Sequence, residues 1–264
     1  METAAALRLS VESALAGRVS APFAYRDRKI TETVPSGIPQ LDFLAGGLPR
    51  GSLTEICGPS CSGHTTILLS ALASLTTQPE ACALIDARDA FDPHSAEVAG
   101  VNLKNLLWVR CRNIDQSLRA ADLLLQGGGF GLIALDLNDI PPKTVRYVPL
   151  NTWFRFRKAV ENTSTILLFL EQESNAKTCS SLVLNLAMES SEWTSTSETA
   201  AFQSHACLLD GFHARVELLR STIKPLTAIS PDRRHRFSLR NLETTFAAAT
   251  NWSFKNRAKS LSQF

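Results

Sequence analysis

The sequence has no apolar run that approaches the roughly 18 residues needed to cross a membrane. It also lacks a basic N-terminal region followed by a continuous apolar stretch, so we expect no secretory signal, no membrane partner and a location in the cytoplasm. None of its six cysteines forms a C-x-x-C pair, and four lie in or beside apolar runs. We therefore predict free, mostly buried thiols rather than disulfides or a zinc site.

Apolar residues make up 44% of the 264 residues, and charged residues make up 20%. This composition excludes intrinsic disorder of the whole chain, and the length suits one large α/β domain with extensions. The net charge of +2 is unevenly placed, because residues 213–264 hold ten Lys or Arg but only three acids. A basic C-terminal end indicates either an anionic partner or a solvated tail.

Short apolar segments alternate with helical patterns along most of the chain. Strands are expected at residues 52–57, 82–86, 106–109, 132–135, 165–170, 182–188, 206–209 and 215–219. Helices are expected at residues 3–16, 64–75, 94–99, 115–126 (with Asp115 as the cap) and 152–161. This alternation predicts an α/β fold with a mostly parallel sheet flanked by helices, and the last strands are expected to be antiparallel additions at one edge.

Three parts are expected along the chain. A helix and a polar arm occupy residues 1–35, the core occupies residues 36–222, and a basic tail occupies residues 223–264. Because the tail is polar with scattered aromatic residues, we expect it to be partly disordered. Within the core, the glycine-rich stretch at residues 46–51 is typical of a turn.

The loop after the first core strand matches the phosphate-binding pattern G-x-x-x-x-G-K-[ST] except at the lysine. Its residues are Gly58, Pro59, Ser60, Cys61, Ser62, Gly63, His64, Thr65 and Thr66. In such a loop the backbone amides and the following helix N-terminus face a phosphate, and the hydroxyl, here Thr65, holds Mg²⁺. His64 replaces the lysine, and an imidazole with a pKa of about 6.5 supplies less charge and less reach. If a nucleotide binds, we expect affinity to rise between about pH 7.5 and 6, as His64 gains a proton.

Several further motifs keep a common order and spacing with this loop. They are Ser36-Gly37-Ile38, Gly46 to Gly51, Glu55-Ile56, Leu84 to Pro93, Val101-Asn102, residues 132–136 and residues 167–172. Through these motifs, residues 30–220 resemble the RecA family of recombinases. The resemblance implies a RecA-like P-loop fold in which Asp136 ends the Walker B strand and Gln172 senses the γ-phosphate. It also implies ATP as the cofactor, with Mg²⁺ held by Thr65 and Asp136.

One departure from the family concerns the stretch that starts with Ile85-Asp86-Ala87. The family has its catalytic glutamate next, whereas this chain has Arg88, and a guanidinium stays protonated and cannot act as a base. Asp89 is a poor substitute, because neighbours on an extended segment point to opposite sides. Losing one such group typically lowers the rate by roughly 10²–10³. With both His64 and Arg88 present, we predict no catalytic residue and no ATP turnover, while nucleotide binding stays open.

The family reads DNA with two mobile loops, which correspond here to residues 139–148 and 173–180. Both are short and carry few basic residues, although phosphate contacts need several. Candidate contacts to nucleic acid or a partner are Lys143, Arg146, Arg155, Arg157, Lys158, Arg233, Arg234 and Arg236. The basic and aromatic run at residues 153–158 is typical of single-strand binding, but an amphipathic helix with core aromatic residues is the favoured interpretation.

Among divergent relatives of the family, a RecA-like body of this length with a decayed ATP site resembles the ImuA group. That resemblance implies a non-hydrolysing accessory role in DNA repair and in damage-induced (SOS) translesion mutagenesis. The implied partners are a RecA filament, a catalytically inactive Y-family polymerase of the ImuB type and an error-prone polymerase, with DNA as a further candidate. Two alternatives stay open: a DNA-dependent ATPase or recombinase with an altered loop, and a SulA-like cell-division inhibitor.

Overall fold

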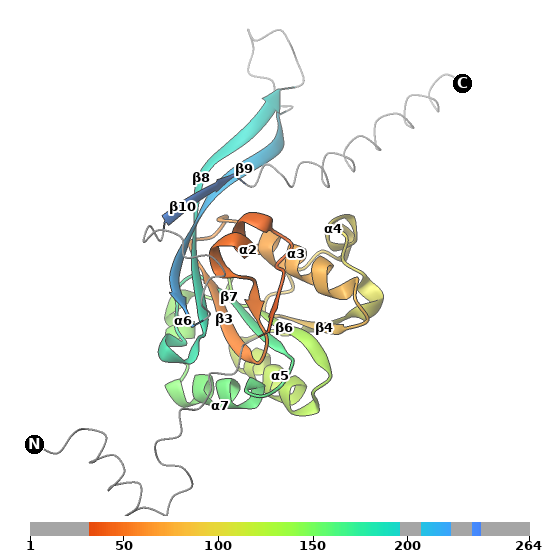
Figure 1. Ribbon diagram of the computed structural model, residues 1–264, viewed down its shortest axis with the longest axis vertical. Helices are drawn as coiled ribbons and strands as arrows, with labels where there is room; N and C mark the ends of the chain where they lie inside the picture. The colour runs from red at the N-terminus through yellow and green to blue at the C-terminus, as the bar shows by residue number, and fades with distance from the viewer. Residues whose placement is uncertain (1–31, 196–206, 223–233, 239–264) are drawn as a thin grey trace, which may run out of the picture. The chain divides into compact units, whose positions relative to one another are not determined.

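The computed structural model describes residues 32–195, 207–222 and 234–238, and within them the main sheet has eight strands (Figure 1). In spatial order these are β10 (Arg234–Ser238), β9 (Cys207–Ser221), β8 (Leu182–Ser195), β3 (Ser52–Cys57), β7 (Ile166–Glu171), β6 (Phe130–Asp136), β4 (Ala81–Asp86) and β5 (Leu106–Arg110). Strands β3 to β8 run parallel. At one edge β9 pairs antiparallel with β8, and β10 pairs antiparallel with β9. The predicted α/β fold, with a mostly parallel sheet and antiparallel additions, is confirmed.

Helices cover both faces of this sheet (Figure 1). They are α2 (Pro39–Ala45), α3 (His64–Thr76), α4 (Pro93–Val98), α5 (Ile114–Gly127), α6 (Pro142–Arg146) and α7 (Leu150–Val160), with the 3₁₀ turns η1 (Leu103–Asn105) and η2 (Lys177–Cys179). Helices α2 and α3 pack on one face, and α5 and α7 pack on the other. The predicted turn at residues 46–51 contains a short strand, β2 (Leu48–Pro49), which pairs with β1 (Thr33–Val34).

Two hydrophobic cores follow from the period-2 alternation of the buried strands. On β7, Leu168 and Leu170 face the core under α3, whereas Leu167 and Phe169 face the core under α5 and α7. Trp153 of α7 packs edge-on against Phe169, with ring centroids 4.9 Å apart. Trp153 and Phe156 are buried and Phe154 is exposed, so α7 is an amphipathic helix with a Trp and a Phe in the core.

Two details of the expected elements are wrong. The first residue of α5 is Ile114, and its cap is Asn113, whose side chain accepts from the Gln116 amide, so Asp115 lies inside the first turn. Either Asx residue can cap a helix, and only the backbone conformation decides between them. The separate strands expected at 206–209 and 215–219 form one strand, β9, because its ladder with β8 runs on through bulges.

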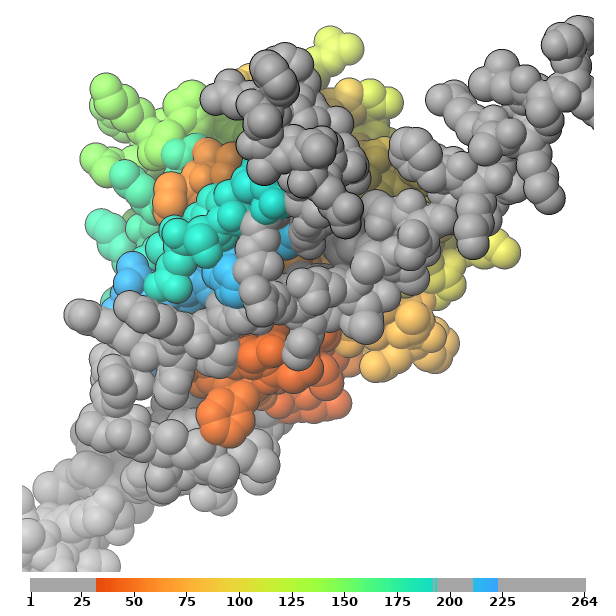
Figure 2. Space-filling view, turned by 90° about the horizontal axis from the view of Figure 1, so that it is seen from above, coloured from red at the N-terminus to blue at the C-terminus, as the bar shows by residue number. Residues whose placement is uncertain are grey.

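Strand β8 is much longer than its neighbour β3, which pairs only with residues 182–185. Beyond that point β8 is paired with β9 alone in the described residues, and Figure 2 shows the two strands lying side by side. In the described ranges, no helix is long and apolar enough to cross a membrane. The helix expected at residues 3–16 lies outside those ranges, as does most of the tail, and the limits of the three parts stay predictions.

Candidate nucleotide-binding site

The loop between β3 and α3, residues 58–66, has the backbone of a phosphate cradle. Gly58 and Gly63 both have positive φ values, 152° and 102°, which favour glycine. A Cβ atom on Gly58 would lie 2.4 Å from the Leu186 carbonyl oxygen of β8, so the loop needs glycine there for space as well. The Gly58 amide donates to the Glu171 carbonyl at 3.2 Å, which ties the start of the loop to β7.

The polar side chains of the loop divide into an inner and an outer group. Ser62 is buried, and its hydroxyl donates to the Pro59 carbonyl at 2.7 Å, closing the loop on itself. The exposed side chains are Pro59, Ser60, Cys61 and Thr65, and Thr66 is half-buried. Thr65 therefore keeps its hydroxyl at the surface, where the resemblance places the Mg²⁺ ligand.

His64, which replaces the lysine, is turned into the protein. Its side chain is buried, its Nδ1 lies 3.2 Å from the Ser62 hydroxyl, and its Nε2 has no hydrogen-bond partner among the described residues. Burial lowers the pKa of His64 to about 4, while the Glu171 carbonyl works in the opposite direction. The ring is thus neutral between pH 6 and 7.5. The reason for expecting nucleotide affinity to rise as the pH falls across that range does not hold, because His64 gains no proton there.

Arg88 occupies the place of the family's catalytic glutamate and is exposed. Its Nε donates to the Asp139 carbonyl at 3.2 Å, so the guanidinium holds the loop that follows β6. Asp89 has a φ of 62° and pairs with Arg110, which lowers the pKa of Asp89. Neither residue can act as a base here, because one is a cation and the other is committed to a cation.

Asp136 ends β6 and remains a candidate ligand for a cation. Burial raises its pKa to about 6, with Asp86 and Asp139 adding to the shift and hydrogen bonds from Asn138 opposing it. Gln172 follows β7, and its amide donates to the Asn138 carbonyl at 2.7 Å. The fold thus joins the two predicted residues through Asn138, at the carboxyl edge of neighbouring strands.

The two regions that correspond to the family's DNA-reading loops meet at one pocket of about 470 Å³. Its lining residues are Arg146, Val148, Leu150, Trp153, Glu173, Ser174, Asn175 and Lys177. Part of the first region is helical, as α6, where we expected a loop. Arg146 pairs across the pocket with Glu173, so some of the basic charge is neutralised locally.

The other basic candidates lie apart from this pocket or have partners. Arg155 pairs with Asp122 at 2.7 Å, Lys158 pairs with Glu161 at 3.2 Å, and Arg157 donates to the Thr178 carbonyl. Lys143 is exposed on α6. Arg234 and Arg236 are in β10, of which only the backbone is described, and Arg233 lies outside the described residues. Their contacts with nucleic acid or a partner stay predictions.

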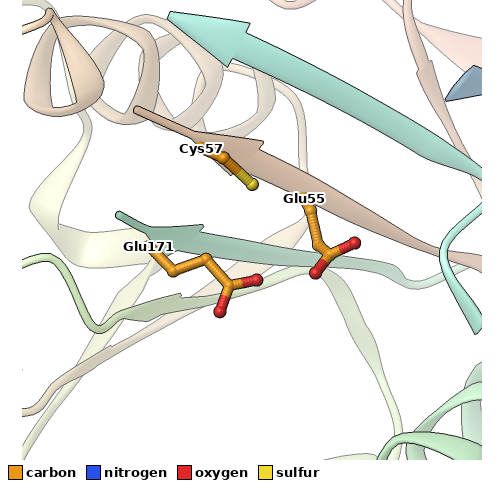
Figure 3. Close-up of side chains that lie close together, drawn as sticks. All are labelled: Glu55, Cys57 and Glu171. Carbon is orange, nitrogen blue, oxygen red and sulfur yellow. The ribbon is translucent and has the colours of Figure 1, made fainter. Parts of the chain in front are cut away.

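The sequence did not predict that two buried acids beneath the loop lie together as a pair. Glu55 and Glu171 are both fully buried, and with Cys57 they place one ligand atom each within 4.8 Å of the others (Figure 3). Both acids lie in stretches that carry the family resemblance, but no local pattern brings them together. Register does, because β3 and β7 are parallel neighbours and Cys57 lies opposite Glu171.

Comparisons with known proteins agree with this geometry. Residues 17–144 match the family described as RecA N-terminal domain. The chain is 42% identical over 107 residues to Protein RecA of Acinetobacter baumannii, which is 40% of this chain and 31% of that protein. It is 42% identical over 105 residues to Protein RecA of Cutibacterium acnes (39% and 30%) and 37% identical over 113 residues to that of Streptomyces ambofaciens (42% and 30%).

The chain therefore spans less than a third of the length of each of these curated relatives. The matched segment includes β3, the phosphate loop, α3 and the strands to β6, whereas β7 and Gln172 lie beyond it. The matches support a relationship to the RecA family, and the matched segment is similar to the RecA N-terminal domain.

Proposed function

We propose that this chain is a RecA-like accessory protein in DNA repair that holds ATP at the loop of residues 58–66 without cleaving it. One observation carries the proposal. The loop keeps its glycine-built cradle, while His64 turns inward in a neutral state instead of offering a cation. A site of this kind can hold a phosphate through its backbone, but it lacks the charge that gathers the γ-phosphate.

The residues present fit a nucleotide only in part. The backbone amides of the loop and the first turn of α3 would hold the phosphates, and the Thr65 hydroxyl and Asp136 would hold Mg²⁺. The metal, when bound, neutralises charge on the phosphate oxygens. Because the pKa of Asp136 is raised to about 6, this carboxyl is mostly ionised at pH 7.5 and can serve as a ligand there.

Cleavage needs a group that orients and deprotonates the attacking water. The corresponding segment offers Arg88, whose guanidinium holds the Asp139 carbonyl, and Asp89, which is paired with Arg110. Each missing electrostatic group lowers a rate by roughly 10²–10³, so the loss of two predicts turnover far below that of an active ATPase.

The charge pattern of α6 and α7 favours a protein partner over DNA at these helices. Arg146, Arg155 and Lys158 each pair with an acid, which leaves fewer cations on these two helices for a phosphate backbone. We propose the partners that the resemblance to the ImuA group implies: a RecA filament, an inactive Y-family polymerase of the ImuB type and an error-prone polymerase. The finer role is then support of damage-induced translesion mutagenesis.

Binding and turnover can be measured on one preparation. A fluorescent ATP analogue reports binding to the full chain at pH 7.5 with Mg²⁺, and phosphate release is followed with and without single-stranded DNA. We expect saturable binding, weakened in Thr65→Ala, and no phosphate release. Release that is stimulated by DNA and lost in Asp136→Ala would instead indicate an ATPase with an altered loop.

The partner proposal has a separate test. Immobilised chain is offered purified RecA assembled on single-stranded DNA, the two polymerases and, as the comparison, a tubulin-like division GTPase. We expect capture of the filament or a polymerase. Selective capture of the GTPase would favour the division inhibitor and contradict the repair role.

A further inference from the structure

The buried acid pair, Glu55 on β3 and Glu171 at the end of β7, has no role in the proposed function. Both side chains are fully buried and point toward one another beneath the phosphate loop (Figure 3). They share one face of the sheet with Cys57 and approach it within 4.8 Å. Two carboxyl groups this close in the interior cannot both be ionised without a large cost, because burial removes the water that would screen them.

Glu55 has the contacts of an ionised carboxylate. Its Oε1 accepts from the backbone amides of Asn175, at 2.9 Å, and Ala176, at 2.8 Å. Its Oε2 accepts from the hydroxyls of Ser174, at 3.0 Å, and Ser180. Four donors satisfy both oxygens, so Glu55 fastens the segment of residues 174–180 to the strand that leads into the phosphate loop.

Glu171 lacks such support. Its Oε2 accepts from the Asn175 side-chain amide at 2.9 Å, while its Oε1 has no partner among the described residues that can donate to it. Burial, and then the neighbouring Glu55, raise the pKa of Glu171 well above its ordinary value. Glu171 therefore has one carboxyl oxygen that can hold a proton and donate it to the neighbouring carboxylate of Glu55.

We propose that Glu171 is a neutral acid whose proton is turned toward Glu55, and that this proton lets Glu55 stay ionised and hold residues 174–180 on β3. A divalent cation is the competing occupant. The oxygens of Glu55 are already taken by four donors, and burial raises the pKa of the Cys57 thiol and keeps it protonated. A proton needs only one additional, shared acceptor contact on Glu55, whereas a cation would need open ligand atoms on several side chains.

Other titratable or charged groups surround the pair on the elements packed around it. They are Cys57 on β3, His64 on α3, Arg157 on α7, Glu173 in the connecting loop, and Lys177 and Cys179 in η2. Burial raises the pKa of both thiols and lowers that of His64 to about 4, and the three charged side chains are exposed. Comparison with a variant that lacks only the Glu171 carboxyl therefore assigns the titration to this group.

The variant Glu171→Gln keeps the shape of the neutral acid and cannot ionise. The unfolded wild-type chain releases the Glu171 proton near its ordinary pKa of 4.5, whereas the folded chain keeps it. Raising the pH therefore destabilises the wild type but not the variant, by tenfold in the unfolding constant per pH unit until the folded pKa is reached. We expect the ratio of the two unfolding constants to be smallest near pH 4.5 and to rise with pH above it, in favour of Glu171→Gln.

Urea unfolding of the full chain at pH 4.5 to 8 measures this ratio, and Glu173→Gln, an exposed neighbour paired with Arg146, is the matched control with a flat ratio. Infrared difference spectra should show a protonated carboxyl band that Glu171→Gln removes. A ratio that does not change with pH, or absence of that band, overturns the proposal. So does stabilisation of the wild type, but not of Glu171→Gln, by added Mn²⁺ or Zn²⁺, which would assign the site to a cation.

Discussion

The phosphate loop and the buried acid pair lie at the same carboxyl end of β3, yet they treat charge in different ways. In the loop the side chain that would carry a charge, His64, is buried, and its Nε2 has no partner within the described part of the chain. In the acid pair four donors surround Glu55. Burial shifts His64 and Glu171 toward their neutral forms, in opposite pKa directions. The contrast teaches that this interior keeps a charge only where donors are built around it.

The largest effect on stability is expected at Glu55, the charged member of the acid pair. Replacing Glu55 by glutamine leaves two backbone amides and two hydroxyls with a neutral partner that accepts through one atom only. We expect a loss of about 3 kcal/mol or more in the free energy of unfolding. Urea unfolding at pH 7 measures it, and Glu161→Gln, on the exposed Lys158 pair, should lose under about 1 kcal/mol. A loss of similar size in both variants would remove the distinction between the regions.

The loop should fail through its backbone and not through its side chains. Gly58→Ala places a Cβ atom 2.4 Å from the Leu186 carbonyl at a φ of 152°, so we expect a loss of about 2 kcal/mol. Gly127→Ala meets nothing within 4 Å at the end of α5 and serves as the control, with little change or a small gain. Equal stability of Gly58→Ala and the wild type would show that the loop is not held as described.

Acid should destabilise the loop side. The unfolded chain protonates His64 as the pH falls through 6.5, whereas the folded chain resists protonation until about 4. The contribution of His64 is therefore complete above pH 6.5 and is lost as the pH falls toward 4, by about 1–2 kcal/mol at pH 5. Comparing His64→Gln with the wild type at pH 5 and pH 7.5 isolates this group, because the other titrating groups are common to both. A difference that stays constant with pH would place the ring in solvent.

The smallest effect is expected at the surface. Arg155→Ala removes an exposed ion pair with Asp122, so we expect under about 1 kcal/mol of stability to be lost. We also expect little change in the retention of single-stranded DNA, because the pair already neutralises this arginine. A marked loss of DNA retention would make α7 a nucleic-acid surface. It would support single-strand binding by residues 153–158, which the burial of Trp153 disfavours.

Much of the fold was predictable from the sequence for simple reasons. The buried parallel strands are nearly continuous apolar runs, and glycines bound the phosphate loop, so both stood out without any tertiary information. The orientation of His64 was not predictable, since it depends on space beside β7. The pairing of Glu55 with Glu171 could not be predicted either, because it arises from the order of the strands in the sheet. The residue pattern within one strand does not indicate which strand lies beside it.

The central claim is that the loop holds a triphosphate and leaves it whole. Purified chain is incubated with ATP and Mg²⁺ for several hours at pH 7.5, freed of unbound nucleotide, denatured, and its bound nucleotide identified by chromatography. We expect intact ATP to be recovered, in amounts that fall in Thr65→Ala. Recovery of ADP, with several phosphates released per chain, would contradict it.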